Sequence, residues 1–371
     1  MSRFAVCVFI GWLVPSALAL QSNTVSDETN TSIEAQIESV ISKRAASLNE
    51  FNAAFNSIYA RQLSSIRPCT EQTIIPAIDE IKVCSDTLRN EGNAPFALFP
   101  SQPKALVVLF HGLSDSPYFL RSIATHLASK GYAVVAPLTP GHGKKEADAD
   151  MQDESLQMRW YEHVDEIMDL ANASHEKVFI GGFSTGGALA TQFTLSNSED
   201  VQGLLLFSGA LQLSDSAETL SNIWGSKALA EWLDGDYQTQ GPNPYKYPSV
   251  ATYSALVLMD VIKDIRFQLD TLEQTPLKKP IFAAHSLADT TTLYEGVEDL
   301  LNKVDGDHTR FKIDEEFEVC HADLVVSAPQ LIAMNFDKSQ VNQSERCKVP
   351  QANPLHQNML SVLVHFLDEN V

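Results

Sequence analysis

The residues best suited to chemistry lie in the pentapeptide Gly182-Phe183-Ser184-Thr185-Gly186, which is a Gly-x-Ser-x-Gly motif. The apolar run 177–181 before it predicts a short buried strand, and residues 187–193 after it predict the start of a helix. A strand, a sharp turn and a helix form the context in which this motif makes a nucleophile elbow. Glycines suit such a turn because it leaves no room for β-carbons beside the serine. Ser184 is therefore the candidate nucleophile, and a glycine-rich turn without chemistry is the alternative.

A serine hydroxyl needs a base to take its proton and a carboxylate to orient that base. After a nucleophile elbow the acid comes first along the chain and the histidine second, each at the carboxyl end of a strand. Asp289 is the carboxylate in the loop after the apolar run 280–285. It is the candidate acid, and an aspartate that only stabilises its own turn is the alternative.

His321 is the candidate base because it follows a strand predicted near 317–319. His356, which opens the terminal helix, is the second candidate. His308 lies in a predicted polar loop and His365 lies within the terminal helix, so both are weaker candidates.

The tetrahedral intermediate of acyl transfer needs two backbone N–H donors for its oxyanion. The first expected donor is Thr185, which follows the nucleophile at a helix N-terminus. The second is Leu113, in the loop after the apolar run 105–110. His111, in the same loop, is expected to shape the loop rather than act as a base.

The elements that must position these residues alternate between buried strands and helices, which predicts a mostly parallel, doubly wound α/β sheet. Apolar strand runs occur at 105–110, 132–136, 177–181, 203–208 and 280–285. Helical segments at 217–233 and 250–272 interrupt this alternation, so about 212–276 are expected to be an inserted helical cap over the site. A terminal helix is predicted at 357–368.

The chain before this domain has two predicted parts. Residues 1–19 resemble a signal peptide, because an uncharged run ends in Ala17-Leu18-Ala19 and polar sequence follows. Cleavage near Ala19 predicts a secreted or periplasmic protein with no later membrane span. Residues 20–93 are expected to be a helical extension and connector, and 94–371 the catalytic domain. The apolar face of a helix over 32–66 is expected to pack on that domain, with oligomerisation or membrane-surface binding as the alternative.

Four cysteines remain after the predicted cleavage: Cys69, Cys84, Cys320 and Cys347. Four cysteines allow three pairings, and four free thiols are the alternative. The pairs Cys69–Cys84 and Cys320–Cys347 are preferred because each closes a short local loop. No metal-ligand spacing is evident, so neither a metal nor a cofactor is expected.

Three motifs in this order resemble the α/β-hydrolase fold family, in its monoacylglycerol lipase and bacterial carboxylesterase branch, which is often described as serine aminopeptidase-like. They are residues 111–117, Pro140-Gly141-His142-Gly143 and the Ser184 pentapeptide with Gly187. The resemblance covers about 94–370 and implies Ser184, Asp289 and His321 as a triad, Leu113 and Thr185 as oxyanion donors, and a helical cap over an acyl pocket. Three features depart from the family: the region 32–93, Cys320 before the histidine, and an insertion over 328–353.

The sequence therefore predicts an exported serine hydrolase that cleaves small acyl esters. A peptidase or amidase using the same triad, or a binding protein on an inactive hydrolase scaffold, are the alternatives. The formal net charge of −21 argues against nucleic acid as a partner. The oligomeric state is not indicated.

Overall fold

The computed structural model describes residues 27–70, 75–214, 238–271 and 277–371, with the backbone alone for 27–42. The predicted signal peptide and the predicted cap helix 217–233 lie outside the described residues. The chain forms two compact units, one up to Asn49 and one from Glu50 to Val371, and their boundary falls inside helix α1 (Asp27–Gln62). The candidate site belongs entirely to the second unit.

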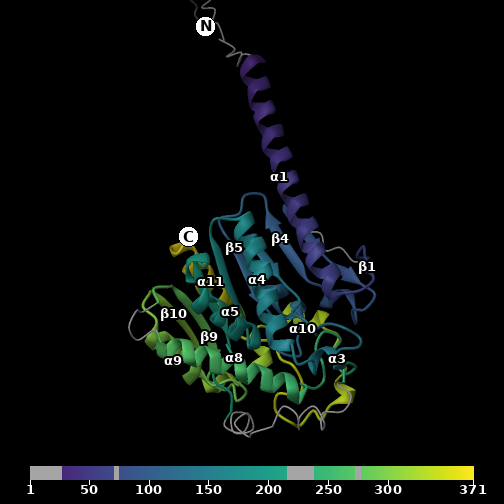
Figure 1. The fold of residues 1–371 in the computed structure, drawn as a ribbon, viewed down its shortest axis with the longest axis vertical. Helices are drawn as coiled ribbons and strands as arrows, with labels where there is room; N and C mark the ends of the chain where they lie inside the picture. Colours follow the sequence, from purple (N-terminus) through teal and green to yellow (C-terminus); the bar gives the residue numbers. More distant parts are fainter. Residues whose placement is uncertain (1–26, 71–74, 215–237, 272–276) are drawn as a thin grey trace, which may run out of the picture. The chain divides into compact units, whose positions relative to one another are not determined.

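One sheet organises the second unit (Figure 1). Among the described residues its eight strands lie in the order β10 (His308–Ile313), β9 (Ile281–Ser286), β8 (Gly203–Phe207), β7 (Val178–Phe183), β5 (Leu106–Phe110), β6 (Ala133–Ala136), β4 (Phe96–Pro100) and β2 (Ile78–Lys82). The strands from β10 to β6 are parallel, and β4 and β2 continue the sheet antiparallel. The predicted mostly parallel α/β sheet is confirmed.

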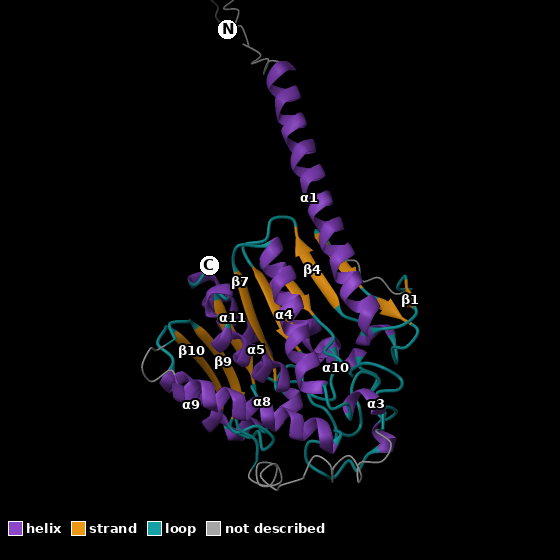
Figure 2. Cartoon of the chain, in the orientation of Figure 1, coloured by secondary structure: helices purple, strands orange, loops and turns teal. Residues whose placement is uncertain are grey.

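Helices cover both faces of this sheet (Figure 2). Side chains alternate along a strand, so one strand supplies both faces. On β7, Phe179 and Phe183 join the core formed with α2 (Arg121–Ser129) and α11 (His356–Glu369). The helices α4 (Leu156–Ser174), α5 (Thr185–Ser196) and α8 (Thr252–Thr271) contact one another on the opposite face.

Shorter elements connect these layers. They are β1 (Ile66–Arg67), β3 (Cys84–Ser85), η1 (Glu91–Asn93), η2 (Pro117–Leu120), α3 (Asp148–Met151), η3 (Ser198–Asp200), α9 (Tyr294–Lys303), η5 (Glu315–Phe317), η6 (His321–Asp323), α10 (Ala328–Ala333) and η7 (Lys338–Gln340). No helix within the described ranges is long and apolar enough to cross a bilayer.

The strand predicted at 317–319 is wrong. Phe317 ends the 3-10 helix η5, and Glu318 has a left-handed φ of 50°. The last strand is β10, so His308 begins a strand instead of lying in a polar loop. Among the described residues β10 is an edge strand paired with β9, and its Arg310 and Lys312 are exposed. It therefore lacks the continuous apolar run that marks a strand buried on both faces.

The second unit includes the end of α1, whose apolar side chains are buried. Phe51, Phe55 and Tyr59 are at most 4% exposed, and the Phe51 ring lies 4.9 Å from the ring of Phe99 on β4. The hydroxyl of Tyr59 accepts a hydrogen bond from the Leu138 N–H. This part of the helix packs on the sheet domain.

Candidate active site

Ser184 lies in the sharp turn between β7 and α5. Its φ of 54° and ψ of −117° are unusual for a residue with a side chain, and such strain is typical of functional sites. The turn is tightly enclosed: a β-carbon at Gly186 would lie 2.0 Å from the carbonyl oxygen of Phe110, and one at Gly182 would lie 2.4 Å from the same atom. Only glycine fits at these two positions, and the serine side chain is therefore presented at the sheet edge.

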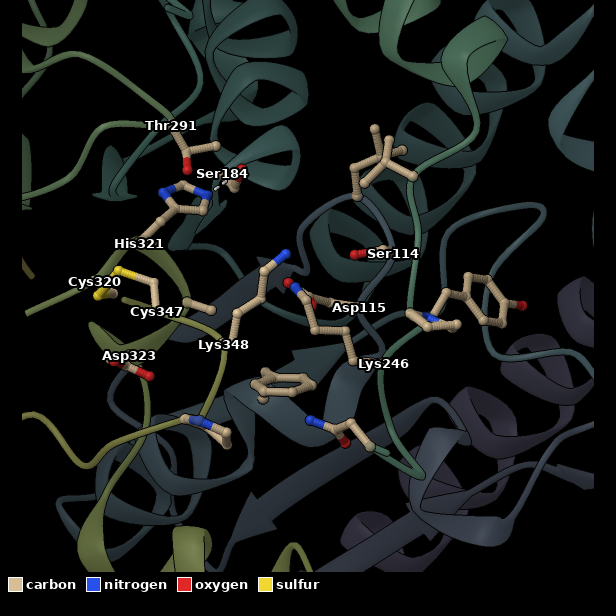
Figure 3. Close-up of a pocket in the computed structure, with 18 of the residues that line it drawn as sticks. Ser114, Asp115, Ser184, Lys246, Thr291, Cys320, His321, Asp323, Cys347 and Lys348 are labelled. Atoms are coloured by element: carbon tan, nitrogen blue, oxygen red, sulfur yellow. Dashed lines mark hydrogen bonds and ion pairs between the residues drawn. A yellow bond between two sulfur atoms is a disulfide. The ribbon is translucent and has the colours of Figure 1, made fainter. Parts of the chain in front are cut away.

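The structure brings the three candidate triad residues into one hydrogen-bonded line. Figure 3 shows His321 beside Ser184 at the cavity. His321 Nε2 lies 2.9 Å from Ser184 Oγ, and His321 Nδ1 lies 2.6 Å from Asp289 Oδ2. A carboxylate only accepts, so Nδ1 donates to Asp289 and Nε2 is free to accept the serine proton. The Phe183 ring packs 4.8 Å from the imidazole. This arrangement is what a serine nucleophile and its general base require.

The carboxylate of Asp289 is buried, and groups of the protein donate hydrogen bonds to both of its oxygens. Its Oδ1 accepts from the N–H groups of Thr291 at 2.8 Å and Thr292 at 3.2 Å, and its Oδ2 accepts from the Thr292 hydroxyl at 2.9 Å. Burial tends to raise the pKa of Asp289, but the electrostatic interaction and hydrogen bond with His321, the nearby His285 and the Thr291 N–H outweigh burial and lower the pKa to about 2. The carboxylate is therefore ionised at neutral pH and can stabilise a protonated histidine.

The competing histidines have other contacts. His308 Nε2 bonds to the Val304 carbonyl at 2.7 Å. His365 is exposed and lies 3.3 Å from Glu369. His356 is buried at the start of α11, where burial lowers its pKa to about 4. Of these candidates, His321 is the one in contact with Ser184 Oγ.

The predicted oxyanion donors, Leu113 and Thr185, line the same cavity as Ser184. The loop that carries Leu113 is held by His111, whose Nε2 accepts from the Thr139 N–H at 3.1 Å while Nδ1 donates to the Gly112 carbonyl at 2.9 Å. Burial lowers the pKa of His111 to about 4, so the ring is neutral and can accept at Nε2. His111 therefore fastens the loop to the segment after β6.

The cavity in front of Ser184 has a volume of about 740 Å³, which is in the range of small-molecule sites. Its apolar lining includes Phe119, Leu213, Val250 and Leu258. Its charged lining consists of Asp115, Lys246, Asp323 and Lys348, whose side chains face the cavity in Figure 3. The lining therefore combines apolar and charged side chains.

Sequence reasoning did not identify one wall of this cavity. Phe336, Val341, Lys348 and Pro350 come from the segment that the resemblance marks as an insertion. No local periodicity points to that role. The spacing of Cys320 and Cys347 was the available signal, because it predicts that the insertion returns to the candidate histidine.

Both preferred cysteine pairs are disulfides in the structure. Cys69 bonds to Cys84 beside β3, and Cys320 bonds to Cys347 at the cavity wall. The second bond closes on the residue directly before His321.

The comparison with protein families gives a match over most of the sheet domain. The family model described as serine aminopeptidase, S33, matches residues 101–318, which is more than half of the chain. The chain belongs to this family. Its fold is the α/β-hydrolase fold, as the order of motifs predicted. The match includes Ser184 and Asp289 and ends just before His321.

Relatives of known sequence or structure are distant members of the same fold. The chain is 25% identical over 169 residues to a thermostable monoacylglycerol lipase of Bacillus sp. (strain H-257), a match that covers 45% of this chain and 65% of that lipase. The solved structure of the Paleococcus ferrophilus monoacylglycerol lipase has a TM-score of 0.51 at 17% identity, covering 73% of this chain and 96% of that one. A structure from work on the metagenome-derived lipolytic enzymes LipS and LipT has a TM-score of 0.50 at 18% identity, covering 70% of this chain and 96% of that one. These structures establish the fold alone.

Proposed function

We propose that this protein is a serine hydrolase that cleaves small carboxylic esters with Ser184, His321 and Asp289 as its triad. The observation that carries the proposal is the hydrogen-bonded line from Ser184 Oγ to His321 to Asp289, with separations of 2.9 and 2.6 Å, at the mouth of a partly apolar cavity. The monoacylglycerol lipase relative supports carboxylic esters as the substrate class.

Each residue has one role in the proposed reaction. Ser184 Oγ attacks the ester carbonyl carbon while its proton passes to His321 Nε2. The carbonyl oxygen becomes an oxyanion, which the N–H groups of Leu113 and Thr185 stabilise. The bond to the alcohol oxygen then breaks, His321 gives its proton to the departing alcohol, and an acyl-serine remains.

Water completes the cycle by the same steps in reverse. His321 takes a proton from water, the hydroxide attacks the acyl carbon, and the acid leaves as the proton returns to Ser184 Oγ. Asp289 stays ionised and stabilises the charged imidazole in both halves. The chain's own residues supply every proton transfer in this scheme, and neither a metal nor a cofactor takes part.

The decisive experiment is hydrolysis of chromogenic acyl esters of increasing chain length by the protein and by its Ser184→Ala variant. We expect wild-type turnover with a preference among chain lengths, and a loss of about 10⁶-fold in the variant. Equal rates for the two proteins would falsify the assignment. A fluorophosphonate probe that labels the wild type and not the variant identifies the nucleophile independently.

A peptidase or amidase activity of the same triad is the second candidate, since the family's description names a serine aminopeptidase. Such an enzyme needs an anionic group for the substrate's N-terminal ammonium. Among the described residues, two carboxylates line the cavity. Asp115 is paired with Lys246 at 2.5 Å, and Asp323 is buried with its Oδ1 accepting from the Gln351 N–H at 2.9 Å, which favours the ester assignment. Parallel assays with an acyl ester and an aminoacyl amide of the same acyl size separate the two.

We also propose export of the protein. The signal-like residues 1–19 and the two disulfides support this, because disulfides persist in oxidising compartments. N-terminal sequencing of the protein recovered outside the producing cell should find a start close to Leu20. Recovery of the intact N-terminus from the cytoplasm alone would contradict export.

A further inference from the structure

Residues 242–247, which we call the strap, run antiparallel to residues 114–116 of the loop that carries Leu113. Three successive contacts join them: the Tyr247 N–H donates to the Ser114 carbonyl at 2.8 Å, Lys246 Nζ pairs with Asp115 Oδ1 at 2.5 Å, and the Ser116 hydroxyl donates to the Tyr245 carbonyl at 2.9 Å. The two segments are far apart in the sequence. We call residues 111–117 the oxyanion loop. Three consecutive residues of the strap thus contact three consecutive residues of this loop.

The middle contact is the ion pair of Lys246 with Asp115, two residues after the candidate oxyanion donor Leu113. The side chain of Asp115 is 1% exposed, and its Oδ2 lies so close to Gly112 that a β-carbon there would be 2.6 Å from it. The Asp115 N–H also donates to the Gly112 carbonyl at 3.1 Å. A buried carboxylate requires a cation or hydrogen bonds. Lys246 provides that cation at Oδ1 of Asp115, whose other oxygen lies close to Gly112, the residue that precedes Leu113.

The other side of the strap is held by residues next to η1. The Arg89 guanidinium donates to the carbonyls of Lys246 and Asn243, both at 2.9 Å, and the Asn90 amide donates to the Pro244 carbonyl at 2.6 Å. Guanidinium groups that bind two carbonyls at once fix the direction of the backbone between them. The strap is therefore clamped between the η1 region and the oxyanion loop.

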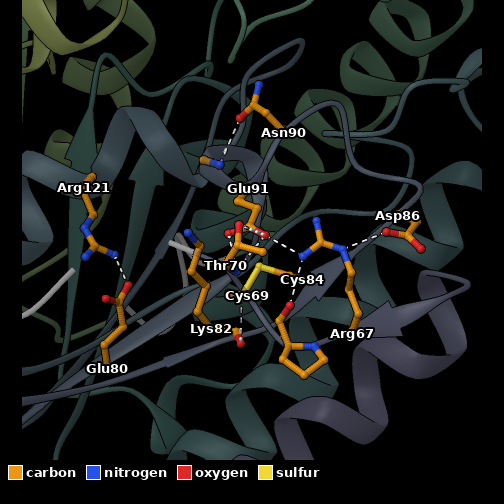
Figure 4. The surroundings of a disulfide bond; sticks show 12 residues. Arg67, Cys69, Thr70, Glu80, Lys82, Cys84, Asp86, Asn90, Glu91 and Arg121 are labelled. Carbon is orange, nitrogen blue, oxygen red and sulfur yellow. Dashed lines mark hydrogen bonds and ion pairs between the residues drawn. A yellow bond between two sulfur atoms is a disulfide. The ribbon is translucent and has the colours of Figure 1, made fainter. Parts of the chain in front are cut away.

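The η1 region is itself held by the first disulfide (Figure 4). Glu91 accepts from Arg67 Nη1 at 2.5 Å and from the Thr70 N–H at 2.9 Å. Thr70 is adjacent to Cys69, which is bonded to Cys84. Contacts thus run without interruption from the N-terminal extension through the strap to the oxyanion loop, which carries Leu113.

We propose that Lys246 is a positioning residue for catalysis: its ion pair with Asp115 holds the oxyanion loop so that the Leu113 N–H points at the developing oxyanion. The N-terminal extension supports this geometry through Arg89. The inference rests on the proposed function, since it assigns Leu113 as a donor. It gives a catalytic role to a region that precedes the residues 101–318 matched by the family model.

Loss of the ion pair should act on turnover rather than on substrate affinity. Oxyanion donors bind the charge of the transition state, so a displaced donor lowers kcat and leaves KM nearly unchanged. Removal of one such donor lowers kcat by about 10²–10³-fold, and displacement of the donor should cost less. We expect Lys246→Met to lower kcat by about 10- to 100-fold.

The test compares four variants on one neutral acyl ester, each with its thermal unfolding midpoint. Lys246→Met should show the fall in kcat, and Lys246→Arg should recover most of it because a guanidinium also pairs with a carboxylate. Lys104→Met is the matched control: it removes a lysine paired with Asp368 at 2.6 Å, and Lys104 does not line the cavity. It should keep wild-type kcat.

The double variant Asp115→Asn/Lys246→Met separates loss of the ion pair from misfolding caused by an unpaired buried charge. It buries no unpaired charge, so it should fold, and it should still have a reduced kcat because the tie to the loop is gone. The inference is overturned if folded Lys246→Met keeps wild-type kcat, including the case in which only its KM rises. The rate of fluorophosphonate labelling of Ser184 should fall in parallel.

The two proposals fail in different ways. Wild-type protein that takes up the probe but hydrolyses no acyl ester contradicts the ester assignment. Labelling rates that Lys246→Met leaves unchanged contradict the role of Lys246.

Discussion

Cys320 is bonded to Cys347, and the bond stands one residue before His321, whose Nε2 lies 2.9 Å from Ser184 Oγ. Both cysteines also line the cavity. The covalent tie therefore holds the cavity wall and the candidate base together.

Removing that disulfide should lower both stability and turnover. The bond closes a loop with a sequence separation of 27, so its loss should cost about 2–4 kcal/mol of unfolding free energy. Greater freedom at His321 should also lower kcat, by an amount measured at a temperature where the variant is folded. Denaturant unfolding and ester turnover of Cys320→Ser/Cys347→Ser check this. Wild-type kcat in the folded variant would show that the bond serves stability alone.

Asp289→Asn should keep the fold and lose turnover. The amide can still accept at one oxygen from Thr291 and Thr292, but it no longer fixes the required tautomer of His321 or stabilises its charged form. A fall in kcat of about 10⁴-fold is expected. Asp323→Asn is the matched control. Asp323 is also buried, it follows His321 by two residues, and its Oδ1 accepts from the Gln351 N–H. It should lower kcat less than about tenfold, and equal losses would argue against a special role for Asp289.

Gly186→Ala should prevent stable folding. The new β-carbon would lie 2.0 Å from the carbonyl oxygen of Phe110, a backbone atom that cannot move aside cheaply. A destabilisation of about 3 kcal/mol or more is expected, visible as a lower unfolding midpoint or insoluble expression. Gly209→Ala is the control, because its β-carbon would meet its nearest neighbour, a Leu206 side-chain atom, at 3.3 Å. The prediction is contradicted if the two variants are equally stable.

Stability should fall as the pH drops below about 6.5. Burial lowers the pKa of His111 and His356 to about 4 and of His142 and His163 to about 3. Between pH 6.5 and these values the unfolded chain binds protons that the folded chain does not, so the unfolding free energy decreases with decreasing pH. Burial raises the pKa of Asp323 to about 6, which acts in the opposite direction between that value and about 3.9.

The combined effect of these four histidines on the unfolding free energy should exceed the opposite effect of Asp323. The unfolding free energy should decrease by more than about 2 kcal/mol between pH 7 and pH 5. Denaturant titrations at several pH values measure it directly. A profile that is flat or rises toward acid would contradict the neutral state of the buried histidines.

The local pattern around Ser184 was sufficient to predict a strand, a turn and a helix, because the residues involved are contiguous. β7 and α5 lie where the apolar runs indicated, and the glycines are required by contacts within a few residues of the turn. Asp289 was chosen as a candidate from its position after an apolar run. His321 was chosen from a strand predicted before it and from the order that an elbow imposes. The family match supports this reading of the fold.

β10 shows where such reasoning fails. An edge strand is solvated along one side, so charged residues such as Arg310 and Lys312 interrupt its apolar pattern. The candidate histidine was still found, although the strand before it was misplaced by several residues. The prediction was wrong about the position of the last strand and not about the order of the motifs along the chain.

The sequence by itself determined the parallel sheet, the elbow and the candidate triad, since each depends on residues that are close together or on a fixed order along the chain. Only the tertiary structure decided that Lys246 of the strap pairs with Asp115, and that Arg89, near the first disulfide, donates a hydrogen bond to the strap. The contacts of the strap with Asp115 and with Arg89 join segments separated by more than 100 residues. No local spacing or periodicity encodes such a pairing, because it depends on how the packed elements bring their loops to one edge of the sheet.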